Sequence, residues 1–349
     1  MKGQPMSETV TAKKAPERNR CLDFFKGVSA LSVVFGHIPF PGRFGKCISA
    51  VGSCGILLFF LISGYYAYGD GEKRRPKLMK RFRRNLCILL IAIAVYTAVT
   101  AVEFYVTHRN MHGFLRPFMR PEYYLRLLLW GDLEPIHGDP LWFLFALLQA
   151  YLFFWLMYRL RLQKYAKFAM PVFILLRIGL ETYKYAVNGD WRICSNVLAA
   201  ALPLMLLGYC MAEQRERLMR IPAVAAAVCG IVSLICVFLL VCFDPFRYNI
   251  SQIFKITAAV SAMLFALQMP ALRLFPPLSA LGGSCSLHVY LWHMPVIVLA
   301  YLICERHSLS QRFYEWYLPP IVAAVSVVIA VLIVTVQNII KHRQSTAVE

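Results

Sequence analysis

Residues 22–37 read Leu22-Asp23-Phe24-Phe25-Lys26-Gly27-Val28-Ser29-Ala30-Leu31-Ser32-Val33-Val34-Phe35-Gly36-His37, an apolar stretch that carries three ionisable side chains. It covers most of the first of ten apolar stretches, each close to the roughly 20 residues that a helix needs to cross a bilayer. They lie at about 24–40, 47–68, 86–106, 141–160, 166–185, 195–212, 222–243, 252–270, 282–303 and 318–340. We therefore expect an all-α fold, a polytopic transmembrane helical bundle of about ten helices.

The composition agrees with a protein whose outer surface faces lipid. Of the 349 residues, 59% are hydrophobic and only 16% are charged, whereas a soluble domain carries about 25% charged residues. This apolar excess is too large for a single soluble core. It excludes an ordinary soluble domain.

The formal net charge of +19 has two explanations. One is a nucleic-acid or anionic-lipid partner, and the other is the cytoplasmic excess of Lys and Arg that membrane proteins show. Position favours the second, because most of the 37 basic residues fall in segments that are cytoplasmic if the N-terminus is inside. We expect both termini in the cytoplasm, a multi-pass protein of the inner (cytoplasmic) membrane, the bilayer as partner and no nucleic-acid partner.

Polar segments flank the predicted bundle, which spans residues 21–341. Residues 1–20 are polar and basic without a signal peptide, so a disordered cytoplasmic tail is expected there. A second short tail is expected over 342–349. The longest outer loop, 107–140, contains an aromatic segment from Pro121 to Trp130 that predicts a short interfacial helix. That loop either carries function or acts as a lid that only packs on the bundle.

The ionisable residues of the first stretch indicate a site, because such groups are costly within a membrane. Lys26 and His37 are eleven residues apart, which places them within about 20° of one helix face and about 16 Å apart along the axis. Pro39 and Pro41 predict that the helix ends near His37. An elongated anionic ligand could contact both ends, with Asp23 orienting Lys26 as an i,i+3 ion pair. The alternative is a structural histidine.

A basic run from Lys73 to Arg84 follows the second stretch. Lys77 and Arg81, and likewise Lys80 and Arg84, are spaced i,i+4 and share a helix face. Such pairs grip phosphate groups, although an anchor on anionic lipid is the simpler explanation when the run is taken alone.

Two further features are read as structural. Arg177 and Glu181 predict an i,i+4 pair within the fifth stretch, for which a structural clamp is favoured over a catalytic role. The 11 cysteines form no CxxC pair, and nothing in the sequence indicates a metal site. Cys47, Cys194 and Cys304 fall near the predicted outer face, where the sequence leaves one disulfide open.

In order and spacing, these features resemble the acyltransferase-3 family of membrane acyltransferases, over about residues 20–340. Members show an Asp, then Arg or Lys, ten residues and a His in the first helix, matched here by Asp23, Lys26 and His37. This chain departs from the common pattern at Lys26 and Lys80, where Arg is more usual. Lys keeps the charge but loses bidentate phosphate contacts.

Four more family elements have counterparts in this chain. They are Phe59-Phe60-Leu61-Ile62-Ser63-Gly64, the basic group Lys80, Arg81 and Arg84, the segment Leu141-Trp142-Phe143-Leu144, and Ser286-Leu287-His288-Val289-Tyr290-Leu291-Trp292-His293-Met294-Pro295.

The resemblance implies an enzyme, an acyl-CoA-dependent O-acyltransferase. It implies that an acyl group, with acetyl expected, moves from cytoplasmic acetyl-CoA or a related acyl-CoA to a hydroxyl of an envelope or exported glycan, that is, polysaccharide O-acetylation. His37 is the expected catalytic residue, either as general base or as a covalent acyl carrier. Lys26, Lys80, Arg81 and Arg84 are expected to bind the CoA. Supporting or orienting roles are expected for Asp23, Ser63, Trp142, Tyr290 and His293.

Two other classes of function remain open from the residues alone. Buried Lys, His and an Arg–Glu pair also suit the proton relay of a secondary transporter or lipid-linked glycan flippase. The sequence shows no internal symmetry, which weakens this alternative. A membrane sensor or scaffold without chemistry is the third.

Overall fold

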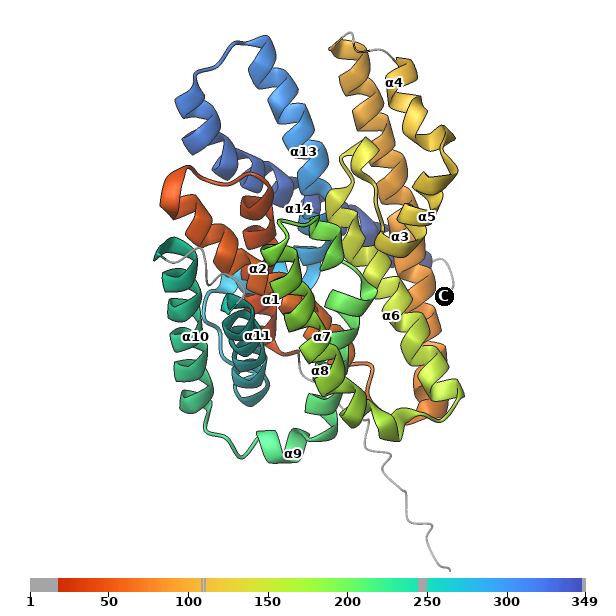
Figure 1. Cartoon of the computed structure of the whole chain (residues 1–349), viewed down its shortest axis with the longest axis vertical. Helices are drawn as coiled ribbons and strands as arrows, with labels where there is room; N and C mark the ends of the chain where they lie inside the picture. Colours follow the sequence, from red (N-terminus) through yellow and green to blue (C-terminus); the bar gives the residue numbers. More distant parts are fainter. Residues whose placement is uncertain (1–17, 108, 110, 244–249, 347–349) are drawn as a thin grey trace, which may run out of the picture.

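The computed structural model describes residues 18–107, 109, 111–243 and 250–346, and all regular secondary structure within them is helical. Figure 1 shows the arrangement of the helices. Their bounds are α1 Arg20–His37, α2 Gly42–Tyr65, α3 Gly71–Val106, α4 Met111–Leu115, α5 Pro121–Trp130, α6 Trp142–Arg159, α7 Ala166–Ala186, α8 Leu202–Glu213, α9 Arg215–Leu218, α10 Ala223–Phe243, α11 Ser251–Gln268, α12 Pro276–Ala280, α13 Ser286–Arg306 and α14 Leu318–Thr346.

A helix lies at each of the ten predicted apolar stretches, so the all-α polytopic bundle is confirmed. Within the described residues, seven helices are long and apolar enough to cross a membrane. The three that fall short are α1, α7 and the segment Val197–Glu213 that contains α8. The first two carry too many charged residues for a simple span, and the third is short. Helix α1 buries Asp23, and α7 buries Arg177 and Glu181.

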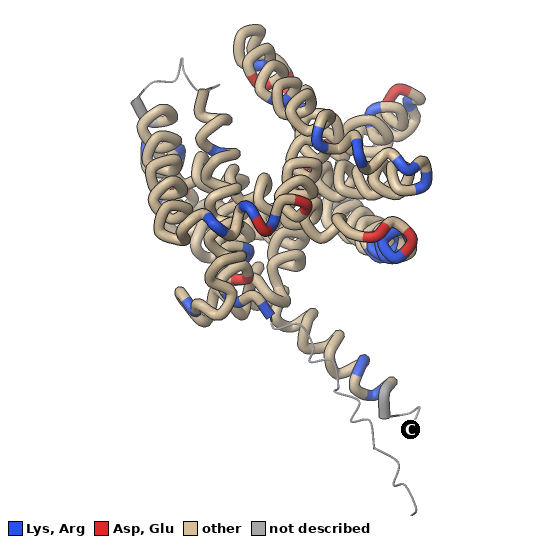
Figure 2. Tube along the Cα trace, turned by 90° about the horizontal axis from the view of Figure 1, so that it is seen from below, with Lys and Arg blue, Asp and Glu red and all other residues tan. Residues whose placement is uncertain are grey.

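The segments predicted to be cytoplasmic gather at one end of the bundle. The start of α3, the turn between α6 and α7, and α9 all lie at the bottom of Figure 1. Seen from below in Figure 2, Lys and Arg occupy short stretches of a tube that is otherwise mostly uncharged. That this end faces the cytoplasm, with both chain termini, stays a prediction.

The first and last helices extend slightly beyond the residues predicted for the bundle, 21–341. The predicted tail 1–20 lies mostly outside the described residues, and α1 already begins at Arg20. Asn19 caps this helix, because its side chain accepts a hydrogen bond from the backbone N–H of Leu22. At the other end α14 continues to Thr346, into the segment predicted as a tail.

Helix α3 is 36 residues long and includes the basic run. Asp70 caps its first turn by accepting from the backbone N–H of Glu72. The sequence predicted an apolar span only over residues 86–106. The earlier turns of α3 are helical but polar, so hydropathy does not detect them. Lys73 through Arg84 therefore stand on a rigid helix.

A close backbone crossing fixes α1 against the segment Leu281–Cys285, a π-helical turn at the start of α13. A Cβ added to Gly282 would lie 1.7 Å from the carbonyl oxygen of Asp23, and one added to Gly27 would lie 2.2 Å from that of Leu278. Only glycine permits the two backbones to approach this closely. This crossing sets the position of Asp23 and the residues that follow it.

We expect Gly282→Ala to destabilise the protein by at least about 1–3 kcal/mol, because α1 must move away from the added methyl group. Thermal unfolding of the purified protein in detergent would measure the loss. Gly179→Ala in α7 is the matched control, since no atom lies within 4 Å of its added Cβ. Equal melting temperatures for the two variants would contradict the packing argument.

Candidate active site

Two histidines from distant parts of the chain meet at the C-terminal end of α1. The ring centroids of His37 and His293 are 5.1 Å apart. His37 is exposed, whereas His293 is completely buried. The Nδ1 atom of His293 lies 2.6 Å from the carbonyl oxygen of Tyr290, and its Nε2 atom has no hydrogen-bond partner among the described residues. A buried polar atom without a partner beside an exposed imidazole is suited to a ligand.

Tyr290 holds the buried histidine in place from the preceding turn of α13. Its hydroxyl donates to the carbonyl oxygen of Pro140, which ties α13 to the start of α6. Its ring lies 6.1 Å from the His293 ring and 5.3 Å from the Phe143 ring. Tyr96 adds a second tie, since its hydroxyl donates to the carbonyl oxygen of Leu291 at 2.7 Å. The histidine pair therefore stands on a firmly packed support.

Asp23 and Lys26 form an ion pair near the other end of α1. The Lys26 ammonium lies 2.9 Å from one Asp23 carboxylate oxygen, and the Arg18 guanidinium contacts the other. Between Lys26 and His37 on the same helix face lie Ala30 and Val33, which are 0% and 4% exposed. That face is thus filled by helix packing between its two ionisable ends.

The basic residues of α3 divide into two groups. Arg74 and Arg81 both donate to the carbonyl oxygen of Tyr66, at 3.2 and 3.3 Å, and Arg84 lies 3.4 Å from the Asn85 side-chain oxygen. Lys80, which the sequence groups with Arg81 and Arg84, is exposed and makes no hydrogen bond or ion pair with another described residue. Sequence reasoning gave no role to Arg74, although it precedes Arg81 by two helical turns.

Tyr66 links the basic residues of α3 to the ion pair of α1. Partial burial raises the pKa of Tyr66, Tyr65 and Asp23 raise it further, and Arg81 lowers it. Asp23 and Arg81 therefore both lie within electrostatic range of one hydroxyl group. The fold thus brings together Lys26 and Arg81, which are far apart in the sequence.

Side chains of α2, α6 and α13 connect this basic region with the histidine pair. Tyr151 lies within electrostatic range of Arg81 and Arg84 and forms a hydrogen bond with Ser63. Ser63 in turn donates to the carbonyl oxygen of Phe59 at 2.8 Å.

The second half of the connection is aromatic. The rings of Phe59 and Phe143 are 6.2 Å apart, and Phe143 contacts Tyr290 beside His293. A line of side-chain contacts therefore runs from Tyr151, which lies within electrostatic range of Arg81 and Arg84, to His37. Sequence reasoning missed Tyr151, whose only signal is a hydroxyl within the apolar stretch 141–160.

Trp142 lies beside this line. Its ring is 6.2 Å from that of Phe60 and 6.4 Å from that of Phe143. On its other side it lines a polar cavity with Arg177 and Glu181. The predicted pairing of those two residues is confirmed, at 3.6 Å.

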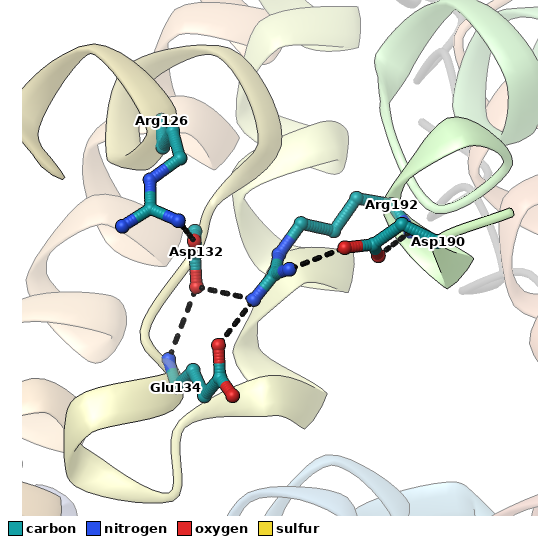
Figure 3. Close-up of polar contacts among 5 residues, drawn as sticks. All are labelled: Arg126, Asp132, Glu134, Asp190 and Arg192. Carbon is teal, nitrogen blue, oxygen red and sulfur yellow. Dashed lines mark hydrogen bonds and ion pairs between the residues drawn. The ribbon is translucent and has the colours of Figure 1, made fainter. Parts of the chain in front are cut away.

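An ionic cluster fixes the long loop 107–140 to the segment after α7 (Figure 3). Arg192 contacts the carboxylates of Asp132, Glu134 and Asp190, and Arg126 lies 3.7 Å from Asp132. The predicted helix from Pro121 to Trp130 is confirmed as α5. The described part of this loop is thus held against the bundle.

The cysteines near the predicted outer face differ in state. Cys47 is disulfide-bonded, whereas Cys194 and Cys304 are free thiols. Among the residues that the structure describes, no group of three or more His, Cys, Asp or Glu residues is placed to hold a metal ion.

The geometry is that of a multi-pass membrane protein with an imidazole pair at the C-terminal end of α1 and cations at one end of the bundle. The family model of an acyltransferase domain, Acyl_transf_3, matches residues 19–337, nearly the whole chain. The chain belongs to this family, the acyltransferase-3 family, so its class of reaction is acyl transfer. No curated protein and no solved structure matches the chain.

Proposed function

We propose that this protein is an acyl-CoA-dependent O-acyltransferase, with acetyl-CoA as the donor and a hydroxyl of an envelope or exported glycan as the acceptor. The observation that supports it best is the His37–His293 pair, with its ring centroids 5.1 Å apart. The line of contacts from this pair to Arg81 and Arg84 adds support, because it joins a reactive imidazole to a site for phosphate.

The anionic end of the donor is held by cations of α1 and α3. Arg81 and Arg84 supply planar guanidinium groups, which suit bidentate phosphate contacts. Lys26 adds a point charge close by. Lys80 is the weakest of the four candidates, because it is exposed and stands apart from the contacts that Arg81 makes.

The pantetheine arm reaches His37 between α2, α6 and α13. The face of α1 between Lys26 and His37 is filled by Ala30 and Val33. The route past Ser63 and Tyr151 instead offers hydrogen-bonding groups at its start and aromatic rings farther on. Such a lining suits a chain that carries amides and a thioester.

The chemical step at His37 has two forms. In the first, His37 takes the proton of the acceptor hydroxyl as that oxygen attacks the thioester carbonyl. The C–O bond forms, the C–S bond breaks, and the proton passes to the departing CoA thiolate. In the second, an imidazole nitrogen of His37 attacks the thioester carbonyl, the C–S bond breaks and CoA leaves as the thiolate. The acceptor hydroxyl then attacks the acyl-imidazole, the N–C bond breaks, and the hydroxyl proton ends on the CoA thiolate. His293 positions His37 in either form, because its ring lies beside that of His37 and its Nε2 atom is not held by any other described residue.

In this proposal the two substrates reach the protein from opposite sides of the membrane. The cations of α3 lie at the end of the bundle that carries the basic turns, which we place in the cytoplasm of the inner membrane. The end that carries α4 and α5 then faces outward, where an envelope glycan is available.

Acyl transfer by purified protein in liposomes tests this function. Radiolabelled acetyl-CoA is supplied with a panel of sugars, and CoA release and sugar labelling are measured together. We expect labelled sugar to appear in proportion to CoA released. Absence of both, together with no measurable acetyl-CoA binding, would refute the proposal and favour a transporter.

A further inference from the structure

A second polar site lies outside the line of contacts described above. It is a cavity of about 140 Å³ between α2, α6, α7 and α11, larger than the roughly 30 Å³ that one water molecule occupies in the liquid. Four charged or amide side chains that line it are at least nine-tenths buried: Arg177, Glu181, Gln252 and Lys255. Ionisable groups at such depth are costly in a membrane protein and indicate function by default.

Arg177 is only partly satisfied by its protein contacts. Its Nη1 atom donates to the carbonyl oxygen of Ala199 at 2.7 Å. Its Nη2 atom makes only long contacts, at 3.5 Å to Gln252 and 3.6 Å to Glu181. Its Nε atom is buried and has no partner among the described residues. Nε and Nη2 form one edge of the guanidinium, and that edge is the one left for a ligand.

The charges around the cavity favour an anion. Glu181 already accepts from Lys184 at 2.6 Å and faces Arg177, so its charge is compensated. Even without Lys255, the described residues that line the cavity include two cationic side chains, Arg177 and Lys184, and one anionic side chain, Glu181. A planar guanidinium edge binds two oxygens of a carboxylate or phosphate at once.

We propose that this cavity binds an oxyanion on the Nε–Nη2 edge of Arg177, and that the oxyanion is a carboxylate or phosphate group of the acceptor. The cavity is connected to the histidine pair by a series of aromatic contacts. Trp142 lines the cavity and contacts Phe143, which contacts Tyr290 beside His293. An acceptor anchored here by its anionic group has its hydroxyl groups directed toward His37. The assignment to the acceptor rests on the proposed function, whereas the binding of an oxyanion does not.

Binding measured without acyl-CoA tests the site independently of catalysis. Isothermal titration calorimetry would compare methyl glucuronide, inorganic phosphate and the neutral methyl glucoside on the purified protein. We expect one of the two anions to bind at one site at least about tenfold more tightly than the glucoside. Preference for the glucuronide identifies an acidic sugar as the source of the oxyanion, and preference for phosphate identifies a phosphate-linked glycan.

Two variants of Arg177 distinguish a protein that misfolds from one that folds but no longer binds the anion. Arg177→Gln is expected to weaken anion binding about ten- to a hundredfold, the cost of one charge-assisted contact. Because this change removes a partner of buried Glu181, Arg177→Gln/Glu181→Gln serves as a second, charge-balanced variant with the same expected loss. Lys167→Gln, an exposed change on the same helix, should bind like the unaltered protein, and so should His37→Ala.

Four results would overturn part or all of this inference. Equal binding of the anions and the glucoside, or wild-type anion affinity in the charge-balanced variant with its fold intact, overturns the site. A protein that transfers acetyl groups yet binds neither anion loses the site but keeps the proposed function. Anion binding at Arg177 without any acyl transfer keeps the site and overturns its assignment to the acceptor.

Discussion

Replacing His37 by Ala is expected to lower the rate of acyl transfer by about 10²–10⁴-fold, the range that a positioned general base contributes. The variant should still bind acetyl-CoA, because the cations of α3 are unchanged. Single-turnover transfer in liposomes, alongside equilibrium binding of acetyl-CoA, measures both quantities. The expected separation of rate from binding is what distinguishes a residue that acts at the thioester from one that only supports the fold.

His288→Ala is the matched control for this prediction. His288 belongs to α13, as His293 does, but it contacts Trp292 and lies on another face of the helix. We expect this variant to transfer acyl groups within about threefold of the unaltered protein, the effect of a peripheral change. Full activity in His37→Ala would leave the family assignment standing and remove His37 from the mechanism. Mass spectrometry of quenched single turnovers would reveal an acyl group on His37 if the covalent route operates.

Replacing both Arg81 and Arg84 by Gln is expected to raise the KM for acetyl-CoA about a hundredfold or more, because hydrogen bonds to charged groups contribute about 1.5–3 kcal/mol each. The maximal rate at saturating donor should change much less, since neither arginine contacts the histidine pair. Steady-state kinetics over a range of acetyl-CoA concentrations separates these two parameters. The donor KM of the unaltered protein should also rise with salt concentration, and that of the variant should rise less.

Arg83→Gln is the control for the arginine variant, because Arg83 is an exposed basic residue of the same helical turn outside the recorded contacts. It should leave the donor KM unchanged. A fall in maximal rate with an unchanged KM in the double variant would place Arg81 and Arg84 outside the donor site. Because Arg81 also donates to the Tyr66 carbonyl, Arg81→Lys tests whether charge alone restores binding.

The sequence by itself determined the helices and their class. Each apolar stretch became a helix because length and hydropathy are local properties that the bilayer selects directly. The i,i+3 and i,i+4 spacings placed Asp23 beside Lys26 and Arg177 beside Glu181, since helical geometry alone fixes such neighbours. Even the charged helices α1 and α7, which are poor spans by composition, were found from their apolar pattern.

The tertiary structure alone decided which of these helices meet. His293 stands beside His37 because α13 crosses α1 at Gly27 and Gly282, a contact between residues more than 250 positions apart that no local pattern encodes. Packing also filled the face of α1 between Lys26 and His37. The Nε–Nη2 edge of Arg177 lies in a cavity that α2, α6, α7 and α11 form together. Local sequence sets the periodicity of a helix. Which side chains are buried, and which of them contact one another, depends on long-range packing, so the arrangement of the site required the tertiary structure.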